Sequence, residues 1–305
     1  MASLAVVILT LNEARHIGRA LDSVAGVAAQ VFVIDAGSID DTVAIAKARG
    51  AIVLTNPWSN HAAQVRWALE HAPITADWVM RLDADEIIGP DLVEAIAKQL
   101  PSLPAEVCGV NLKRRYVFMG RWIKHGGLYP AVFLRIWRRG KAMVEERWMD
   151  EHMVLLQGRA VTFDGEFADV NLNNLSYWVD KHNKYATSEA VEVLAKRYAL
   201  FDRKTNPGLD ASPQAARKRL IKEKLYNHLP LGVGPLGYFT YRYVFQLGFL
   251  DGAEGLIFHG LQGLWYRFLV DAKRAEFDRA LRQVEAREDK LKLLAKLTGL
   301  KLLAE

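Results

Sequence analysis

Short apolar segments alternate with helical patterns through the first hundred residues, and this alternation constrains the fold more than any other feature. The apolar, β-branched segments are each short enough for a buried strand and lie at residues 5–9, 31–34, 52–54 and 78–82. Helix signals separate these segments. Asn12 is predicted as the N-cap of a helix over 13–24, and Asp40 and Asp41 open a second helix, which Gly50 ends. A third helix is predicted at 61–71, and Pro90 takes the first position of a fourth. The pattern predicts an α/β fold with a mostly parallel, doubly wound sheet, in which ligands bind beyond the carboxyl ends of the strands.

The pattern changes beyond residue 107. Strands of antiparallel character are predicted at residues 110–112, 116–118, 132–137 and 153–156. From Leu175 the chain is helical in pattern, and residues 271–305 predict one charged amphipathic helix. We expect the 305 residues to divide into a catalytic domain over 1–225, which includes helices on the acceptor side, and a helical tail over 226–305.

Composition narrows the class of protein. A hydrophobic content of 51% and a charged content of 25% are those of a globular chain, which excludes disordered and collagenous proteins. A single cysteine, Cys108, excludes a disulfide-stabilised secreted scaffold and favours a reducing compartment. The apolar run Leu4–Leu11 lacks the flanking features of a signal peptide, and charged residues interrupt every long apolar stretch, so we expect neither a signal peptide nor a membrane-spanning helix.

Two aspartates follow the fourth predicted strand, in the run Leu82-Asp83-Ala84-Asp85-Glu86. Residues two apart in an extended backbone point the same way, so Asp83 and Asp85 can converge on one hard cation. Magnesium or manganese held by one or two carboxylates keeps coordination positions open for substrate phosphates. A solvated acidic turn that caps the next helix explains the same residues.

A second polar segment, Val33–Thr42, follows the second predicted strand. Asp35 ends that strand, where its carboxylate can accept hydrogen bonds from a nucleobase or ribose, and Gly37 leaves room for close approach to the backbone. An ordinary strand-to-helix turn explains Asp40 and Asp41 but explains Asp35 less well. The loop after the first strand lacks both G-x-G-x-x-G and G-x-x-x-x-G-K-[ST], which excludes a Rossmann dinucleotide site and a P-loop.

These segments, each at a predicted strand end, together resemble the family 2 inverting glycosyltransferases, which have a GT-A fold. Val6–Glu13 is similar to that family's first strand and donor loop, Val33–Thr42 to its V-D-x-G-S-x-D-x-T segment, and Arg81–Glu86 to its L-D-A-D-E metal motif. The resemblance is strongest over residues 1–100 and extends to about 190. It looks closest to bacterial members that build lipopolysaccharide core, O-antigen or exopolysaccharide units, and it implies a metal-dependent hexosyl- or N-acetylhexosaminyl-transferase.

The resemblance implies donor-binding roles for residues at the strand ends and on the helix after the third strand. The donor would be a nucleotide-diphospho-sugar, with a UDP-sugar favoured, and its contacts would be Thr10, Asn12, Glu13, Asp35, Gln64, Arg66 and Asp83. Among them, Asp35 would contact the base and Asp83 the ribose, while Asp85, with Asp83, would bind Mg²⁺ or Mn²⁺ on the diphosphate. An exposed helix arginine is an equally good explanation of Arg66.

Inverting transfer also needs a base that deprotonates the acceptor hydroxyl. The run Trp148-Met149-Asp150-Glu151-His152 resembles the acidic motif that the family carries after its metal site. Asp150 is the first candidate and Glu151 the second, because adjacent acids on a strand point opposite ways. A surface Asp-Glu pair is the alternative, and His152 would then be an orienting or structural residue.

Several residues resemble acceptor-side positions. His125 lies in a glycine-rich segment between predicted strands, and Lys181 and His182 lie near the start of the long helix after Leu175. The resemblance leaves a third metal ligand open between His182 and Asp169. Simple packing of an amphipathic helix on the sheet explains this helix as well.

A basic segment adjoins an aromatic one near the C-terminus. Residues 196–224 carry nine basic and three acidic side chains, so the net charge of this segment, 9 − 3 = +6, exceeds the net charge of +5 of the whole chain. The next segment is rich in aromatic residues and glycine. This juxtaposition favours helices lying on an anionic membrane surface, where a lipid-linked or glycolipid acceptor would be found. We therefore expect a cytoplasmic protein that is peripheral on the inner face of the cytoplasmic membrane.

Other interpretations of the tail and of the reaction stay open. The C-terminal helices could be a buried hairpin or an oligomer interface, whereas no nucleic-acid-binding motif accompanies the basic charge, so we expect no nucleic-acid partner. The nearest enzymatic alternative is transfer to polyprenyl phosphate, whose oxygen needs little help from a base. The non-enzymatic alternative is a scaffold of the same fold that binds membrane or RNA.

Overall fold

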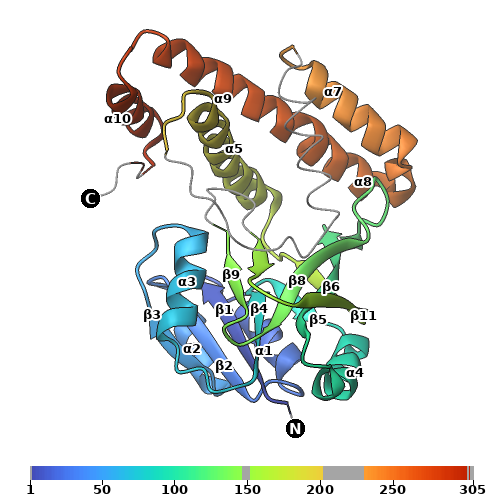
Figure 1. The fold of residues 1–305 in the computed structure, drawn as a ribbon. Helices are drawn as coiled ribbons and strands as arrows, with labels where there is room; N and C mark the ends of the chain where they lie inside the picture. Colours follow the sequence, from blue (N-terminus) through green and yellow to red (C-terminus); the bar gives the residue numbers. More distant parts are fainter. Residues whose placement is uncertain (1, 146–151, 202–229, 301, 303–305) are drawn as a thin grey trace. The chain divides into compact units, whose positions relative to one another are not determined.

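The computed structural model describes residues 2–145, 152–201, 230–300 and 302 (Figure 1). These residues form two compact units: residues 2–145 with 152–172, and residues 173–201 with 230–302. The helix that follows Leu175 belongs to the second unit. The expected domain boundary after residue 225 lies outside the described residues and stays a prediction.

The first unit begins with the predicted parallel strands. The strands are β1 (Leu4–Thr10), β2 (Gln30–Asp35), β3 (Ile52–Thr55) and β4 (Trp78–Asp83), in the spatial order β3-β2-β1-β4 and all parallel. The helices between and after them are α1 (Ile17–Val24), α2 (Thr42–Ala48), α3 (His61–His71) and α4 (Pro90–Gln99). The four predicted parallel strands are confirmed, as are the bounds of α3 and the start of α4.

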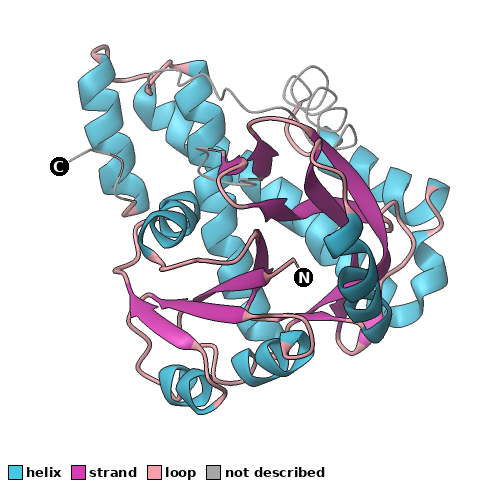
Figure 2. Ribbon diagram, turned by 60° about the horizontal axis from the view of Figure 1, so that its bottom comes forward, coloured by secondary structure: helices cyan, strands magenta, loops and turns pink. Residues whose placement is uncertain are grey.

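The sheet continues as a mixed sheet. Beyond β4 lie β8 (Ala131–Arg138), β6 (Val107–Phe118), β11 (Arg159–Val170) and β5 (Glu86–Ile88), with β7 (Arg121–Trp122) paired to β6. β8 is antiparallel to β4 and β6, while β6 and β11 are parallel (Figure 2). A separate hairpin joins β9 (Ala142–Val144) to β10 (Met153–Leu155).

Several sequence expectations need correction. The two strands predicted at 110–112 and 116–118 are one strand, and strands β5, β7, β9 and β11 were not predicted. Asn12 does not cap α1, which starts at Ile17, because Asn12 has a φ of +56° and its side chain accepts a hydrogen bond from Ile39 instead. The single C-terminal helix is broken into two between residues 281 and 287.

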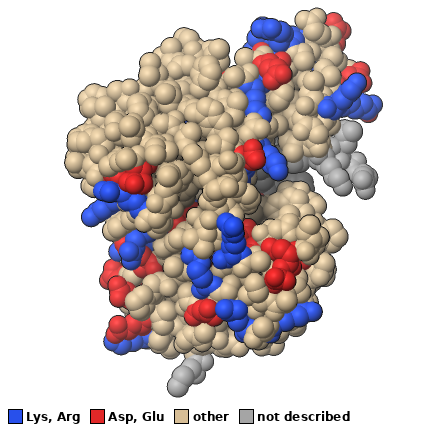
Figure 3. All heavy atoms as spheres, turned by 180° about the vertical axis from the view of Figure 1, so that it is seen from behind, with Lys and Arg blue, Asp and Glu red and all other residues tan. Residues whose placement is uncertain are grey.

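The second unit is helical in its described part. Its elements are α5 (Leu175–Arg197), α7 (Val233–Thr240), the π-helical turn η3 (Tyr241–Phe245), the 3₁₀ turn η4 (Gly248–Asp251), α8 (Gly252–Phe258), the π-helical turn η5 (His259–Trp265), α9 (Tyr266–Leu281) and α10 (Arg287–Thr298). No helix in the described residues is both long and apolar enough to cross a membrane. In Figure 3 the region of α7 and α8, at the upper left, is broadly free of charged side chains.

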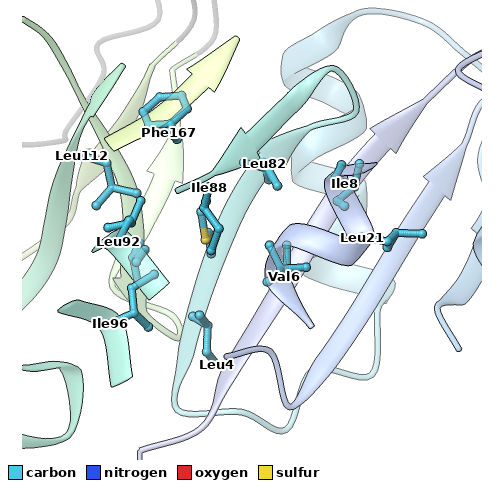
Figure 4. Packing of buried hydrophobic residues seen from close by; sticks show 14 of the residues in the cluster. Leu4, Val6, Ile8, Leu21, Leu82, Ile88, Leu92, Ile96, Leu112 and Phe167 are labelled. Atoms are coloured by element: carbon cyan, nitrogen blue, oxygen red, sulfur yellow. The ribbon is translucent and has the colours of Figure 1, made fainter. Parts of the chain in front are cut away.

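Each unit has its own hydrophobic core. In the first unit, alternate residues of β1 face opposite sides of the sheet: Val6 and Ile8 pack with α1 and α4 (Figure 4), whereas Ala5 and Val7 pack with α3. In the second unit, Leu194 of α5, Leu281 of α9 and Leu294 of α10 are completely buried together. The sheet of the first unit is thus covered on both faces, which leaves its carboxyl edge as the place for a site.

Candidate active site

The strand register brings three of the predicted residues to one edge of the sheet. Thr10 is paired with Asp35 across β1 and β2, and Leu9 is paired with Asp83 across β1 and β4. All three strands are parallel, so their carboxyl ends meet at this edge. Thr10, Asp35 and Asp83 therefore end three neighbouring strands, as the sequence predicted.

The carboxylate of Asp35 is buried and organises the turn that follows it. Its Oδ1 accepts hydrogen bonds from the hydroxyls of Thr10 (3.1 Å) and Ser38 (2.5 Å). Its Oδ2 accepts from the backbone N–H groups of Gly37 (3.0 Å) and Ser38 (2.8 Å). Asp35 was predicted to contact the nucleobase, and the structure gives it a further role in shaping the loop.

The loops after β1 and β2 are held to each other. The backbone N–H of Asn12 donates to the hydroxyl of Ser38 (2.8 Å), and the side chain of Asn12 accepts from the N–H of Ile39 (2.9 Å). Gly37 adopts a φ of +98°, which favours glycine, and no atom lies within 4 Å of the place where a Cβ would stand. The backbone of this turn is therefore open to close approach by a ligand.

Further hydrogen bonds, at Glu13 and Asp40, join the same two loops. The N–H of Glu13 donates to the hydroxyl of Thr42 (2.7 Å), and the N–H of Ala14 donates to Asp40 (3.1 Å). Burial would raise the pKa of Asp40, but hydrogen bonds from Thr42 and Ala14 outweigh it and lower that pKa. Asp40 therefore stays charged and fixes the start of α2.

The side chain of Glu13 contacts a buried histidine. Nδ1 of His16 lies 2.6 Å from a carboxylate oxygen of Glu13, and Nε2 of His16 accepts from the backbone N–H of Leu172 (2.9 Å). Since Nε2 accepts, the ring proton is on Nδ1 and is donated to Glu13. His16 thereby connects the donor loop to the segment that follows β11.

Asp83 lies between positively charged side chains. Its carboxylate oxygens are 3.3 Å from Nε of Arg81 and 3.7 Å from Nη2 of Arg135. Burial opposes ionisation, but Arg81, Arg135 and more distant cations hold the pKa of Asp83 well below its usual range. Asp83 is thus a permanent anion that two protein cations already neutralise in part.

Glu86 lies behind Asp83 and is almost completely buried. Its Oε1 accepts from Nη2 of Arg135 (2.6 Å), and its Oε2 accepts from the backbone N–H of Asp83 (3.0 Å). Burial raises the pKa of Glu86, with Arg135 opposing the rise and Asp83 and Asp169 adding to it. Arg135 therefore supports Asp83 both directly and through Glu86.

Asp85 is held in place by the end of β11 and by the residue that follows it. Its Oδ2 accepts a hydrogen bond from Nδ2 of Asn171 (2.9 Å), and its backbone carbonyl accepts from the N–H of Val170 (2.9 Å). Within the described residues, no three His, Cys, Asp or Glu side chains gather into a metal-binding group. One fixed carboxylate at a strand end, with a second nearby, fits a cation such as Mg²⁺ or Mn²⁺ that takes its other ligands from phosphates and water.

The remaining donor-side predictions have different outcomes in the structure. Gln64 is buried and makes a double contact with Asn56: its Oε1 accepts from Nδ2 (2.6 Å) and its Nε2 donates to the carbonyl (2.9 Å). Gln64 therefore anchors the loop before α3. Arg66 is exposed on the same helix, as expected of a helix arginine.

The predicted bases Asp150 and Glu151 lie outside the described residues. The structure describes both ends of their segment, where the N–H of Glu145 donates to the carbonyl of His152 (2.9 Å). The ring of His152 stacks on Phe133 with centroids 6.0 Å apart, and its Nδ1 lies 3.7 Å from Oε2 of the buried Glu145. His125 is half-buried in the turn after β7.

Lys181 and His182 lie on α5 in the second unit. His182 stacks on Trp178 with centroids 3.5 Å apart, and its Nδ1 bonds to the carbonyl of Trp178 (2.8 Å). Burial lowers the pKa of His182 to about 4. His182 is thus a neutral, packed side chain, and Lys181 contacts the ring face of Tyr185.

Sequence reasoning missed four residues that shape this site. They are Ser38, Arg81, Arg135 and Asn171. Ser38 belongs to the recognised D-x-G-S segment, and its position beside Asp35 could have indicated it. Arg135 comes from β8 and Asn171 directly follows β11, and only the tertiary pairing of those strands brings the two residues near the aspartates.

Part of the chain is similar to known proteins. Uncharacterised glycosyltransferases of Rickettsia felis and Rickettsia prowazekii are each 38% identical to it over 96 residues, which are 32% of this chain and 33% and 32% of the respective relatives. The chain thus matches about a third of the length of these relatives.

Among solved structures, glucosyl-3-phosphoglycerate synthase of Mycobacterium tuberculosis is 26% identical with a TM-score of 0.32, over 38% of this chain and 44% of that one. That enzyme was crystallised with UDP and Mn²⁺, and in another crystal with UDP and Mg²⁺. A similarity of this extent does not establish the substrate or the metal of this chain.

The model of the family "Glycosyl transferase family 2" matches residues 5–163, which is more than half of the chain. The matched region contains β1, β2 and β4 and the loops that follow them. A mixed α/β sheet with flanking helices and a helical C-terminal part agrees with the GT-A architecture expected from the sequence. The chain belongs to glycosyl transferase family 2.

Proposed function

We propose that this enzyme transfers a hexose or N-acetylhexosamine from a nucleotide-diphospho-sugar, a UDP-sugar in the first place, to a lipid-linked or glycolipid acceptor, with inversion at the anomeric carbon. The product would enter bacterial cell-surface polysaccharide such as lipopolysaccharide. One observation carries the donor part of the proposal: Thr10, Asp35 and Asp83 end three neighbouring parallel strands, and hydrogen bonds join the loops after the first two of these residues.

The nucleoside would bind at the loops after β1 and β2. The open backbone at Gly37 admits close approach, and Asn12 and Glu13 are held in place by Ser38 and Thr42. Asp35 would contact the base in addition to holding this turn by its hydrogen bonds. Asp83, ionised beside Arg81, would accept from the ribose hydroxyls.

Asp85 would hold the cation, Mg²⁺ or Mn²⁺, which when bound supplies positive charge to the leaving diphosphate. Asn171 donates to one oxygen of Asp85, in the turn between β4 and β5, and would thereby hold this carboxylate for the cation. Arg81 and Arg135 add positive charge near the same place. Departure of the nucleoside diphosphate would therefore be assisted by charge that is already in position.

The acceptor hydroxyl would be deprotonated by Asp150 or Glu151, the acidic residues between β9 and β10. This role rests on the sequence resemblance. The aromatic and basic C-terminal part supports a location on the inner face of the cytoplasmic membrane, where the acceptor lipid is available.

Donor binding is tested by calorimetry with UDP, UDP-glucose and UDP-N-acetylglucosamine, with and without Mn²⁺. We expect the metal to strengthen binding and Asp85→Asn to remove that gain. Asp164→Asn is the matched control. Asp164 is an exposed carboxylate of the same unit, and it forms an ion pair with Lys113. Equal binding with and without Mn²⁺, in the wild type, would refute the metal role.

The acceptor class is tested by release of nucleoside diphosphate in the presence of membrane lipid extracts. Loss of turnover in Asp150→Asn or Glu151→Gln identifies the base and supports a hydroxyl acceptor. Full turnover in the doubly substituted enzyme would instead favour polyprenyl phosphate as acceptor. No turnover of any bound donor with any lipid would favour a scaffold.

A further inference from the structure

We propose that the hairpin formed by α7–η3 and η4–α8 inserts from one side into a lipid bilayer, by apolar contact and not by attraction to anionic lipid. Six exposed apolar side chains at its turn, here called the apolar tip, would enter the acyl-chain region: Tyr241, Val244, Phe245, Leu247, Phe249 and Leu250. The inference deepens the proposed function, because it would bring the enzyme to a lipid acceptor, but it does not depend on the transfer reaction.

The turn of this hairpin has the opposite character from an ordinary surface turn. Turns between helices are usually polar and rich in Gly, Asn, Asp or Ser. Here Leu247 occupies the left-handed region with a φ of +59°, and Phe245, immediately before the turn, is 72% exposed. An aromatic side chain that is so exposed at a protruding turn has lost the contacts that would stabilise it in water.

The charges of this segment are turned inward. Residues 230–265 contain three charged side chains, of which Arg242 and Asp251 are buried and Glu254 is half-buried. Arg242 donates to the hydroxyl of Tyr238 (2.9 Å) within the hairpin. The hairpin therefore presents no fully exposed charged side chain, although a quarter of the whole chain is charged, and Figure 3 shows the resulting uncharged surface. Such a surface suits lipid, in which exposed charge is costly.

The exposed apolar side chains form one face of the hairpin that continues over its turn. Along α7 and η3 they are Val233, Leu236, Tyr241, Val244 and Phe245. Their helical spacing places them on one half of the helix circumference, while Arg242 and Phe258 are buried on the other side. An uncharged apolar face of this kind suits the surface of a lipid bilayer, which an amphipathic element enters from one side.

The length of the hairpin limits how deeply it would enter the bilayer. The helical run Val233–Phe245 has 13 residues and is about 20 Å long, which is less than the roughly 30 Å of a bilayer's apolar core. The hairpin would accordingly enter from one side and stop within the bilayer.

The proposal is tested by flotation of the full chain with phosphatidylcholine vesicles, which carry no net charge, in about 0.5 M salt to screen surface charge. Wild-type protein is expected to float with the vesicles. A double variant, Phe245→Gln with Leu250→Gln, is expected to bind about 10- to 100-fold more weakly, given the apolar area that each side chain would bury. Leu297→Gln and Met119→Gln are matched controls, because both side chains are exposed and lie outside the hairpin.

Each other outcome overturns the inference. Binding that requires anionic lipid and disappears in salt would indicate electrostatic attachment, and equal binding of the double variant would exclude the apolar tip. A third outcome is that neither protein binds vesicles, while ultracentrifugation shows self-association of the wild type but not of the double variant. The apolar tip would then be an interface between copies of the chain. Circular dichroism of both proteins confirms that the variant is folded. Because flotation uses neither donor nor acceptor, its result is independent of the proposed transfer.

Discussion

Nη2 of Arg135 lies 2.6 Å from Oε1 of Glu86, and both side chains are almost completely inaccessible to solvent. Arg135 also approaches Asp83 to 3.7 Å. One buried guanidinium from β8 thus contacts two acids, Asp83 at the end of β4 and Glu86 at the start of β5.

Removal of Arg135 should strongly destabilise the first unit. Arg135→Met leaves the buried Glu86 without its cation and Asp83 with Arg81 as its remaining ion-pair partner among the described residues, and the loss of one partner from a buried ion pair costs about 3–5 kcal/mol. Urea unfolding measures the change. The double variant Arg135→Met with Glu86→Leu should recover part of the loss, and a double variant as unstable as the sum of the two single ones would contradict the coupling.

Asp35→Asn should destabilise the protein by about 2–3 kcal/mol, because an amide nitrogen cannot accept the hydrogen bonds that the carboxylate accepts. Thr10→Val, which removes one hydroxyl donor, should cost about 1 kcal/mol. Urea unfolding and calorimetry with UDP are the measurements. Asp164→Asn should change neither, and an Asp35→Asn protein of wild-type stability would show that the turn does not need this carboxylate.

Asn171→Ala should weaken Mn²⁺-dependent UDP binding about 10-fold, because Asn171 orients Asp85 without touching the ligand. UDP binding without metal should stay the same, and calorimetry separates the two. A similar loss with and without Mn²⁺ would mean that Asn171 acts on the fold of the loop and not on Asp85.

His259 should make the second unit sensitive to acid. The imidazole is completely buried, and burial together with the charge of Arg242 lowers its pKa to about 4, from an unfolded value of 6.5. The unfolded state takes the proton first, so this contribution to stability is present above pH 6.5 and is lost as the pH falls toward 4. Between pH 7 and pH 5 it amounts to about 2 kcal/mol.

The comparison that isolates this effect is the urea midpoint of wild type and His259→Gln at both pH values. Glutamine does not titrate, so the variant should lose less stability on acidification than the wild type. Parallel losses in the two proteins would assign the acid sensitivity to other groups.

Local sequence signals predicted the four parallel strands and the acids at their ends, because buried parallel strands are short, β-branched and bounded by helix signals. β11 gave no such signal. Its sequence is interrupted by Asp164 and Gly165, and its path is set by pairing with β6 across a bulge. Gly165 is needed there, since a Cβ would lie 2.6 Å from the backbone nitrogen of Leu92 in α4.

Tertiary hydrogen bonds explain the other errors. Asn12 has the chemistry of an N-cap, yet its side chain bonds to Ile39 from the next loop. The contact of Asn171 with Asp85 joins residues 86 positions apart and could not be inferred without β11. The aromatic segment was predicted to lie on a membrane surface, which stays a prediction, and the inward placement of Arg242 and Asp251 is visible only in the folded hairpin.

The hydroxyl of Ser38 links two loops, since it donates to Asp35 and accepts from Asn12. Both loops are therefore ordered before any sugar nucleotide arrives. Entry of the donor should require little rearrangement, so association would be fast and the binding enthalpy would not be spent on loop closure. Selectivity for the nucleotide would then reside in a rigid template, which tolerates few alternative bases.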